Sequence, residues 1–262
     1  MFHLRTRSFV RDLLIVAFIQ CVALFLMWKL ETNFLISAIL VFGIPTCYLL
    51  WRSQKQAVKI IFAASVIGVL GGFVFAFAPE LNGAWQYGEG IIFPRILGVV
   101  PVDELIWSFV CCAFIIAFYE HFIDRSRKRQ PMSAASLMLV LLLSGLSVIN
   151  ALLFYFVPEL LNVPYAYLTV ASVVTVVFLA ASLLRPSLVF HALPMAIYFT
   201  VVNLVYEIVS LHNDHWYFPG EYLGWVSVGG ISLPLEEFVF FILLFSVVIA
   251  VFYELFFDNQ RS

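Results

Sequence analysis

Two adjacent acids, Glu236 and Glu237, open a long apolar run in the stretch ISLPLEEFVFFILLF, residues 231–245. Pro234 precedes them, and proline is favoured at the first position of a helix. A second stretch, VVPVDELIWSFV at residues 99–110, has the same order of a proline followed by two acids. One such pair is a common way to begin a helix, whereas two pairs in so apolar a chain call for a shared explanation.

The composition of the chain is that of a membrane protein. Of its 262 residues, 63% are hydrophobic and 11% are charged, and the mean hydropathy is +1.03. A soluble globular domain carries about 45–50% apolar and about 25% charged residues. The net charge of -2 leaves no basic face for nucleic acid. We therefore expect a multi-pass protein of the cell membrane, surrounded by the lipid bilayer.

Eight segments are long enough to cross a bilayer, which takes about 20 apolar residues. Open sheets cannot satisfy their backbone groups in lipid, so all eight are expected to be helices. The first follows basic residues, as in a signal peptide, but no small-residue cleavage pattern follows it and we expect it to be retained. The predicted spans are residues 9–28, 34–51, 57–79, 97–122, 133–157, 164–183, 188–211 and 232–257.

The distribution of basic residues agrees with eight spans. All but two of the 14 lysines and arginines then fall on the side that holds both termini, and the exceptions are Lys29 and Arg95. Basic residues are enriched on the cytoplasmic side of a membrane. The sequence therefore predicts that both termini are cytoplasmic.

The first four spans and the last four correspond at an offset of about 130 residues, which indicates an internal repeat. Four spans per half is an even number, so the halves share one orientation, as in parallel repeats. The fold class predicted is an all-α membrane protein of two four-helix units, residues 1–124 and 133–262, with a basic linker at 125–132 and a shared cleft. The matched positions are Trp85, Gly88 and Glu89 with Trp216, Gly220 and Glu221; Pro101, Asp103 and Glu104 with Pro234, Glu236 and Glu237; and Tyr119 and Glu120 with Tyr253 and Glu254.

The acidic pairs have both a structural and a functional interpretation. Acids in the first turn of a helix complement the positive end of its dipole. An ionised carboxylate inside a membrane is costly, however, and such residues usually face the bundle interior. Burial disfavours the ionised form, and a neutral carboxylic acid in a dry interior is a good proton donor. Adjacent helical residues point about 100° apart, so one acid of each pair is expected to transfer a proton while its neighbour orients.

Glu237 is our first candidate for the proton donor, and Glu236 is the second. Glu207 is a further candidate, because it has apolar runs on both sides and lies near the same membrane boundary. It is expected to be a second acid of the site or the acceptor of a departing proton, unless it reaches water at the helix end. Asn203 lies one turn earlier on the same helix face.

Aromatic side chains make up 17% of the chain, and several lie close to the acids in sequence. Aromatic faces attract cations, and a dry pocket protects a carbocation from water, so an acid among aromatic rings suits the protonation of an alkene. Tyr119 and Tyr253, at the opposite end of their spans, are instead expected to be interfacial anchors. The candidates for contact with an apolar substrate are Trp85, Trp107, Asn203, Trp216, Phe238 and Phe241.

Other kinds of active site are poorly represented in the sequence. The glycines of GVLGG, residues 68–72, lie inside a predicted helix and are expected to serve close helix packing, not phosphate binding. His212 and His215 flank a loop aspartate without a third histidine, which is a weak metal signal. We expect neither a metal nor a cofactor, which leaves acid–base chemistry on an apolar substrate.

The repeated motif, the upstream Trp and Gly-Glu, and the duplicated layout resemble the membrane-integral lycopene cyclase family. The match is specific at PLEEF, residues 234–238, and looser at PVDEL, residues 101–105. The resemblance implies a redox-neutral isomerisation without a cofactor. An acid protonates the terminal double bond of a linear carotenoid, the next double bond closes onto the cation, and proton loss gives a β, ε or γ ring. It also implies that Asp103 and Glu104 match or support the acids of the second half.

Two alternatives remain open at this point. One is a cyclase that acts on an elongated fifty-carbon carotenoid. The other is a non-catalytic protein, either a transporter or a carotenoid-binding scaffold. A transporter would carry helix-breaking residues at matched mid-membrane positions, but Pro45 and Pro194 lie in segments that do not correspond across the repeat. The sequence gives no oligomeric state.

Overall fold

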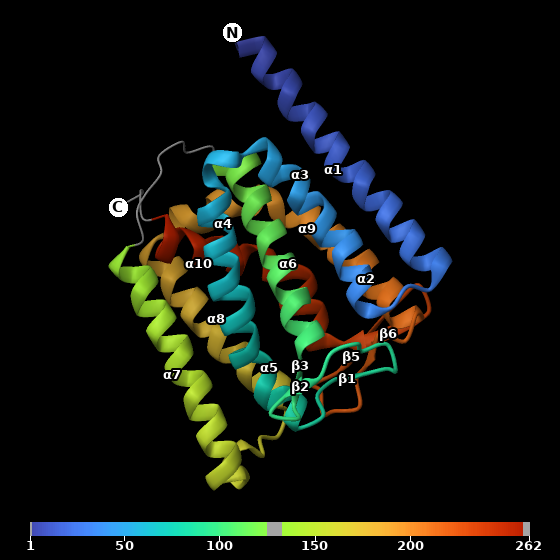
Figure 1. The fold of residues 1–262 in the computed structure, drawn as a ribbon, viewed down its shortest axis with the longest axis vertical. Coiled ribbons are helices and arrows are strands. Elements are labelled where there is room, and N and C mark those ends of the chain that lie inside the picture. The colour runs from blue at the N-terminus through green and yellow to red at the C-terminus, as the bar shows by residue number, and fades with distance from the viewer. Residues whose placement is uncertain (1, 125–132, 259–262) are drawn as a thin grey trace.

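The computed structural model describes residues 2–124 and 133–258 as a bundle of helices with short strands at one end (Figure 1). Within those residues, eight helices are long and apolar enough to cross a membrane, which confirms the predicted number of spans. They are Phe9–Leu30, Phe34–Arg52, Gln54–Leu81, Val102–Asp124, Ala134–Phe156, Ala166–Leu184, Pro186–His212 and Glu237–Phe257.

Several of these spans are built from shorter α-, 3₁₀- and π-helical pieces joined end to end. The helical pieces are α1 (Phe2–Leu30), α2 (Phe34–Ala38), η1 (Ile39–Gly43), α3 (Ile44–Arg52), η2 (Gln54–Gln56), α4 (Ala57–Ala64), η3 (Ser65–Gly71), α5 (Gly72–Leu81), α6 (Val102–Phe118), η4 (Tyr119–Asp124), α7 (Ala134–Phe156), η5 (Pro158–Leu161), α8 (Ala166–Leu184), α9 (Pro186–His212), η6 (Glu237–Leu244) and α10 (Phe245–Phe257). The strands are β1 (Gln86–Tyr87), β2 (Arg95–Ile96), β3 (Val100–Pro101), β4 (Trp216–Tyr217), β5 (Trp225–Val228) and β6 (Ile231–Pro234).

Two predicted spans, 97–122 and 232–257, begin too early in the sequence. In each case the chain first forms a short antiparallel hairpin, β2–β3 or β5–β6, and turns helical after a proline. Pro101 stands in an extended conformation as the N-cap of α6, and Pro234 ends β6. Proline has no backbone N–H to donate, so it fits the end of a strand and the beginning of a helix equally well.

A two-stranded sheet joins the two halves of the sequence. Strand β1 pairs antiparallel with β4, with Gln86 opposite Tyr217 and Tyr87 opposite Trp216. The Tyr217 hydroxyl also donates a hydrogen bond to Gln86 Oε1 at 2.8 Å. Loops that lie far apart in sequence therefore cover the same end of the bundle (Figure 1).

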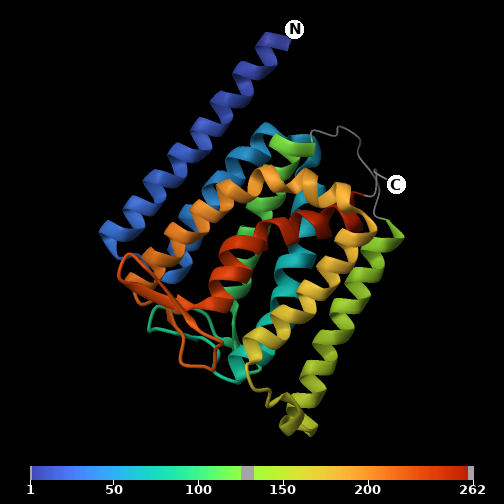
Figure 2. The ribbon, with the colours of Figure 1, turned by 180° about the vertical axis from the view of Figure 1, so that it is seen from behind.

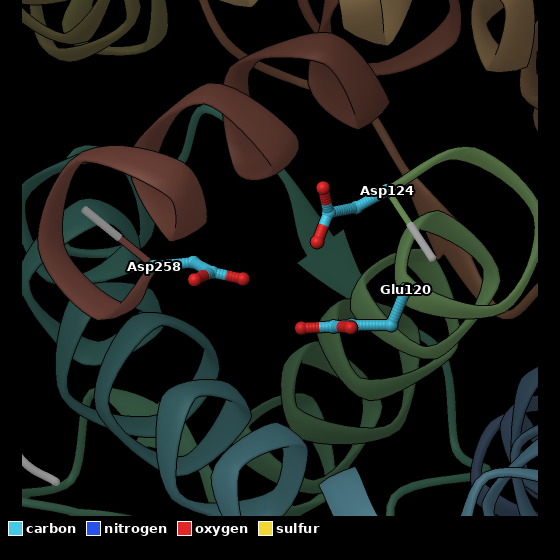
Figure 3. A group of neighbouring side chains, drawn as sticks. All are labelled: Glu120, Asp124 and Asp258. Atoms are coloured by element: carbon cyan, nitrogen blue, oxygen red, sulfur yellow. The ribbon is translucent and has the colours of Figure 1, made fainter. Parts of the chain in front are cut away.

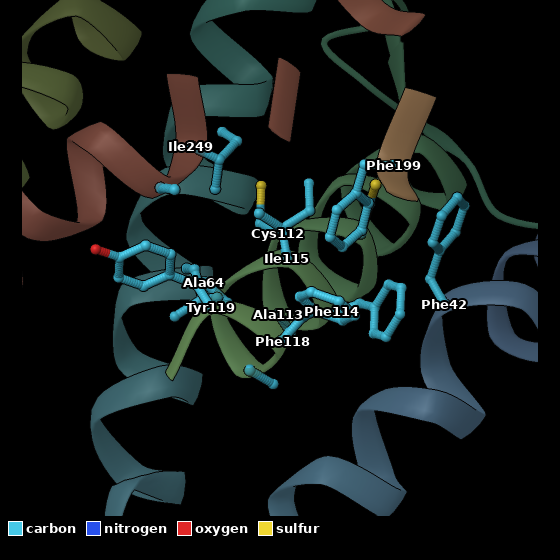
Figure 4. Packing of buried hydrophobic residues seen from close by; sticks show 14 of the residues in the cluster. Phe42, Ala64, Cys112, Ala113, Phe114, Ile115, Phe118, Tyr119, Phe199 and Ile249 are labelled. Carbon is cyan, nitrogen blue, oxygen red and sulfur yellow. The ribbon is translucent and has the colours of Figure 1, made fainter. Parts of the chain in front are cut away.

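Helix α6 is the centre of the bundle. Its later turns pack on all sides, and the rings of Phe114 and Phe118 contact Phe199 of α9, each at a centroid distance of 5.2 Å (Figure 4). Phe42 of η1 approaches Phe114 from another side at 6.4 Å. Lipid is as apolar as these side chains, so burying them against each other gains little from the hydrophobic effect. Close van der Waals packing is what holds these helices together.

Gly68 in η3 allows one of the closest helix contacts in the structure. A Cβ atom added there would lie 2.7 Å from the carbonyl oxygen of Ser108 and 2.9 Å from the Cα of Phe109. Both are backbone atoms of α6 and cannot swing aside. The expectation that the glycines at 68–72 serve helix packing is therefore confirmed for Gly68.

Helices α7 and α8 lie at the edge of the bundle (Figure 2). Ser136 and Leu139 are the buried residues of α7, a few others such as Val140, Leu143 and Phe154 pack against its neighbours, and much of its apolar surface is exposed. A helix that is apolar all round suits a position in contact with acyl chains.

At the end opposite the strands, the two halves exchange hydrogen bonds between tyrosines and acids. The Tyr119 hydroxyl donates to Glu254 Oε1 at 2.5 Å, and the Tyr253 hydroxyl donates to Glu120 Oε1. Both tyrosines are fully buried. The expectation that they anchor the protein at the membrane surface is therefore wrong, because their hydroxyls have partners inside the bundle.

Candidate active site

Three of the predicted acids lie close together at the strand end of the bundle. Glu104 is in the first turn of α6, Glu207 is near the end of α9, and Glu237 begins η6. All three are buried, with 6%, 0% and 9% of their surface exposed. Glu237 is close enough to interact electrostatically with both Glu104 and Glu207. Three helices far apart in sequence thus bring three carboxyl groups into one apolar region.

Glu237 has a phenol as its hydrogen-bond partner. The buried Tyr167 hydroxyl, at the start of α8, donates to Glu237 Oε2 at 2.6 Å. The Tyr167 ring packs edge-on against Trp85 at a centroid distance of 5.2 Å and against Phe75 at 6.0 Å. Tyr167 is absent from the residues predicted from the sequence, because a tyrosine at the start of a membrane span usually indicates an interfacial anchor.

Glu207 is bound by one of the predicted aromatic residues. The indole Nε1 of Trp216 donates to Glu207 Oε1 at 2.9 Å, and Trp216 packs against the rings of Phe34 and Tyr206. The other oxygen of Glu207 is buried and accepts no hydrogen bond from the described residues. Trp216 is therefore both a wall of the site and the donor that fixes this carboxyl group.

The neighbouring acids, Asp103 and Glu236, bind the loops instead. Asp103 accepts hydrogen bonds from the backbone N–H of Ile92 at 3.0 Å and of Phe93 at 2.8 Å. Glu236 accepts one from the backbone N–H of Leu223 at 2.7 Å. The two acids of each pair thus have different partners, as their angular separation on a helix predicts.

Asp103→Asn is expected to destabilise the fold by about 1–3 kcal/mol, because the amide would turn an N–H group toward a backbone N–H that now donates to a carboxylate. The measurement is thermal unfolding of the purified protein in detergent. Glu159→Gln, at an exposed acid of η5, is the matched control. Equal melting temperatures for the two variants would contradict the assigned role of Asp103.

Glu104 has a second acid beside it that the sequence analysis did not select. Glu80, near the end of α5, lies within hydrogen-bonding range of the Glu104 carboxyl group. Arg95 in β2 forms an ion pair with Glu80, with Nη1 2.9 Å from Oε2. Glu80 has no acidic counterpart in the other half, and an acid at the end of a span is usually solvated. For these two reasons Glu80 was not predicted as a site residue from the sequence.

Two phenols in the loops adjoin the acids. Burial raises the pKa of Tyr87 well above its usual value, and the negative charges of Glu104 and Glu80 add to this effect. Burial, followed by the charges of Glu237 and Glu236, also raises the pKa of Tyr222. Both groups therefore keep their hydroxyl protons at neutral pH and are able to donate a hydrogen bond.

The remaining predicted substrate contacts have mixed positions. Trp107 packs against Phe241 at a centroid distance of 5.5 Å, and its indole Nε1 is buried without a hydrogen-bond partner among the described residues. Asn203 is fully buried and donates from Nδ2 to the Phe241 carbonyl at 3.1 Å, so it supports the backbone of η6. Phe238 is half-buried at the margin of the main core.

An open pocket of about 490 Å³ adjoins the site from the loop side. Its lining includes Ala84 and Ala166, the residues immediately before Trp85 and Tyr167 in the sequence. Its other walls are loop residues, several of them polar: Asn82, Asn162, Val163, Pro164, Tyr165, Pro219, Gly220 and Glu221.

Three carboxylates at the opposite end of the bundle have the spacing of a metal site. Ligand oxygens of Glu120, Asp124 and Asp258 lie within 4.8 Å of one another, and the side chains point toward a common centre (Figure 3). Lys59 already supplies a positive charge there, with its Nζ 2.7 Å from Glu120 and 2.7 Å from Asp258. The cluster is therefore a buried ion-pair network.

No protein-family model, curated protein or solved structure matches this chain. The described residues define a mostly helical protein in which eight helices are long and apolar enough to cross a membrane. Buried carboxyl groups lie at one end of the bundle, and an ion-pair network that includes Lys59 lies at the other.

Proposed function

We propose that this chain is a carotenoid cyclase that forms β-type rings at the ends of a linear carotenoid such as lycopene. The observation that carries the proposal is the meeting of Glu104, Glu207 and Glu237 among aromatic rings in an apolar interior. Ionised carboxylates are costly in such surroundings, so a cluster of three acids is expected to keep at least one of them neutral and able to donate a proton. A hydrocarbon substrate offers no polar handle, and a strong interior acid is what its activation requires.

The proposed reaction conserves atoms and electrons. A carboxyl O–H bond breaks as its proton adds to the terminal double bond and leaves a tertiary cation. The π electrons of the next double bond close the ring and move the positive charge onto it. A ring C–H bond then breaks, its electrons form the ring double bond, and a carboxylate takes the proton. No redox cofactor takes part.

The proposal divides the proton transfers between two acids. Glu237 is the donor that the sequence favours, and Glu104 is the equivalent acid of the first half. Trp85 packs against Tyr167, the hydrogen-bond partner of Glu237, and Trp216 donates a hydrogen bond to Glu207. The faces of both indole rings can stabilise a carbocation formed at this site. Glu236 and Asp103 hold the loops that cover the site, which makes them positioning residues.

The same proposal includes a tandem parallel repeat of two four-helix units, with both termini in the cytoplasm of a cell-membrane protein. Two observations support the repeat. Each acidic pair follows a proline that closes a short hairpin. The tyrosine–glutamate bonds are also reciprocal, as expected for units related by an approximate two-fold axis. The predicted basic linker, residues 125–132, lies outside the described residues.

The test is to express the chain in bacteria that accumulate lycopene and to separate the extracted pigments by chromatography. Cyclic carotenoids are the expected product. Unchanged lycopene would reject the lycopene cyclase, and a parallel strain that makes a fifty-carbon carotenoid would then test the elongated substrate. Unchanged pigment in both strains, with the protein present in the membrane, would leave the transporter or carotenoid-binding alternative.

A further inference from the structure

Glu80 is a buried acid with a cation on its outer side. Its side chain is 2% exposed, whereas that of Arg95 is 38% exposed. Arg95 is itself fixed, because its Nη1 also donates to the carbonyl oxygen of Val99 at 2.6 Å. The guanidinium therefore reaches from the water side of the loops to one oxygen of the Glu80 carboxyl group.

The other oxygen of Glu80 and one oxygen of Glu104 are buried without a hydrogen-bond donor among the described residues. Glu80 Oε1 and Glu104 Oε2 are both buried, and neither accepts a hydrogen bond from a donor in the described part of the chain. Yet the two carboxyl groups lie within hydrogen-bonding range of each other. Two ionised carboxylates in this position would repel each other in an apolar environment, whereas a single proton between them gives both oxygens a partner.

Building on the proposed cyclase function, we propose that Glu80 is a positioning residue that holds one proton on Glu104, so that Glu104 enters the reaction as the acid. The charges balance in this state. Ionised Glu80 pairs with Arg95, and protonated Glu104 donates its O–H to Glu80. Buried charges are tolerated when they are paired in this way.

The other groups around Glu104 agree with this assignment. The Tyr87 phenol, the Trp85 indole and the carboxyl group of Glu237 all lie within interaction range, and none of them supplies a positive charge. The charge of Arg95 also acts on Glu104, but Arg95 makes its direct ion pair with Glu80, and this contact favours the ionised form of Glu80.

The sequence favours Glu237 as the donor, but this arrangement assigns the proton donor's role to Glu104 and makes Glu237 the acceptor. The Glu104 O–H bond breaks as the terminal alkene gains a C–H bond. After ring closure, the proton lost from carbon passes to Glu237, whose carboxylate is stabilised by the Tyr167 hydroxyl. Transfer from Glu237 to Glu104 restores the starting state, so no net proton is consumed.

The first experiment compares wild type with Glu80→Gln by infrared spectroscopy of the substrate-free protein in lipid nanodiscs, recording the carbonyl band of protonated carboxyl groups. Without the Glu80 charge, Arg95 pairs with Glu104 and ionises it. We expect the variant to lose the band of one carboxyl group, and its ring formation to fall about 100-fold or more. Glu159→Gln is the control and should leave both readouts unchanged.

The decisive variant combines Glu80→Gln with Arg95→Gln. Removing both charges leaves Glu104 without a cation, so it should take up its proton again. We expect the lost band to return and ring formation to recover in part. A purely structural role for Glu80 predicts that a second substitution brings no recovery. Arg95→Gln alone should gain one protonated carboxyl group, because Glu80 then loses its counter-charge. If Glu80→Gln does not fold, this single variant tests the same link between Arg95 and the protonation of the two acids.

The proposal is overturned if the band persists in Glu80→Gln, or if the double variant shows no recovery of the band. Another outcome would distinguish failure of the shared proton from failure of the proposed cyclase function. If the bands change as expected while the wild type forms no rings from any linear carotenoid, the shared proton stands and the cyclase function fails.

Discussion

Glu237→Gln should abolish ring formation in cells that accumulate lycopene, while the protein still inserts into the membrane. Glutamine has nearly the same shape and can still accept the hydrogen bond from Tyr167, but it can neither give up nor take up a proton under these conditions. General acid–base groups typically contribute about 10²–10⁴-fold to a rate. A loss of that size in the amount of cyclic carotenoid, measured by chromatography, is the expected result.

Two companion variants make this result specific. Glu104→Gln should produce a similar loss, because the reaction needs both a donor and an acceptor. Glu159→Gln, at an exposed acid on the same side of the bundle, should cyclise like wild type. If Glu237→Gln still made rings at the wild-type rate, the proton-transferring acid would have to be sought elsewhere, first at Glu236.

Lys59→Met is expected to cause the largest loss of stability, about 3–5 kcal/mol. The lysine is 2.7 Å from both Glu120 and Asp258, and its side chain is only 10% exposed. Methionine keeps much of the volume of the side chain but removes the positive charge that lies between two buried acids. Removing one partner of a buried ion pair usually costs this much. The measurement is the free energy of unfolding in mixed micelles.

Lys55→Met is the natural control, because Lys55 lies one turn earlier and is exposed. It should unfold like wild type. Lys59→Arg should be intermediate, since it restores the positive charge with a bulkier head group. The same unfolding free energy for Lys59→Met and Lys55→Met would mean that the ion-pair network contributes nothing measurable.

The sequence predicted the number and approximate positions of the apolar spans because a bilayer sets a strict length for each helix. All eight spans were found, and errors were confined to the ends, where residues such as Val99 and Leu233 are apolar but form hairpins. Helix geometry also predicted that the two acids of each pair have different partners, because it gives Asp103 and Glu104 different directions.

Contacts between distant segments were beyond the reach of sequence patterns. Tyr167 and Tyr119 occupy positions typical of interfacial anchors, and only the tertiary structure reveals the acids that they bind. Glu80 lies near the end of its span, where an acid is usually solvated, and nothing in the local sequence predicts that it lies beside Glu104. In the sequence, Arg95 was only one of the two basic residues on the side opposite the termini. The structure shows that it forms an ion pair with Glu80.

The crossed bonds at the far end of the bundle constrain how the protein is made. Tyr119 leaves the ribosome 135 residues ahead of Glu254, and Glu120 precedes Tyr253 by 133 residues. A nascent first half therefore enters the lipid before the second-half partners of Tyr119 and Glu120 exist. Completion of the second half supplies these partners for both units at once. Maturation of the two halves is thus a joint event, and a lesion in either half leaves the other incomplete.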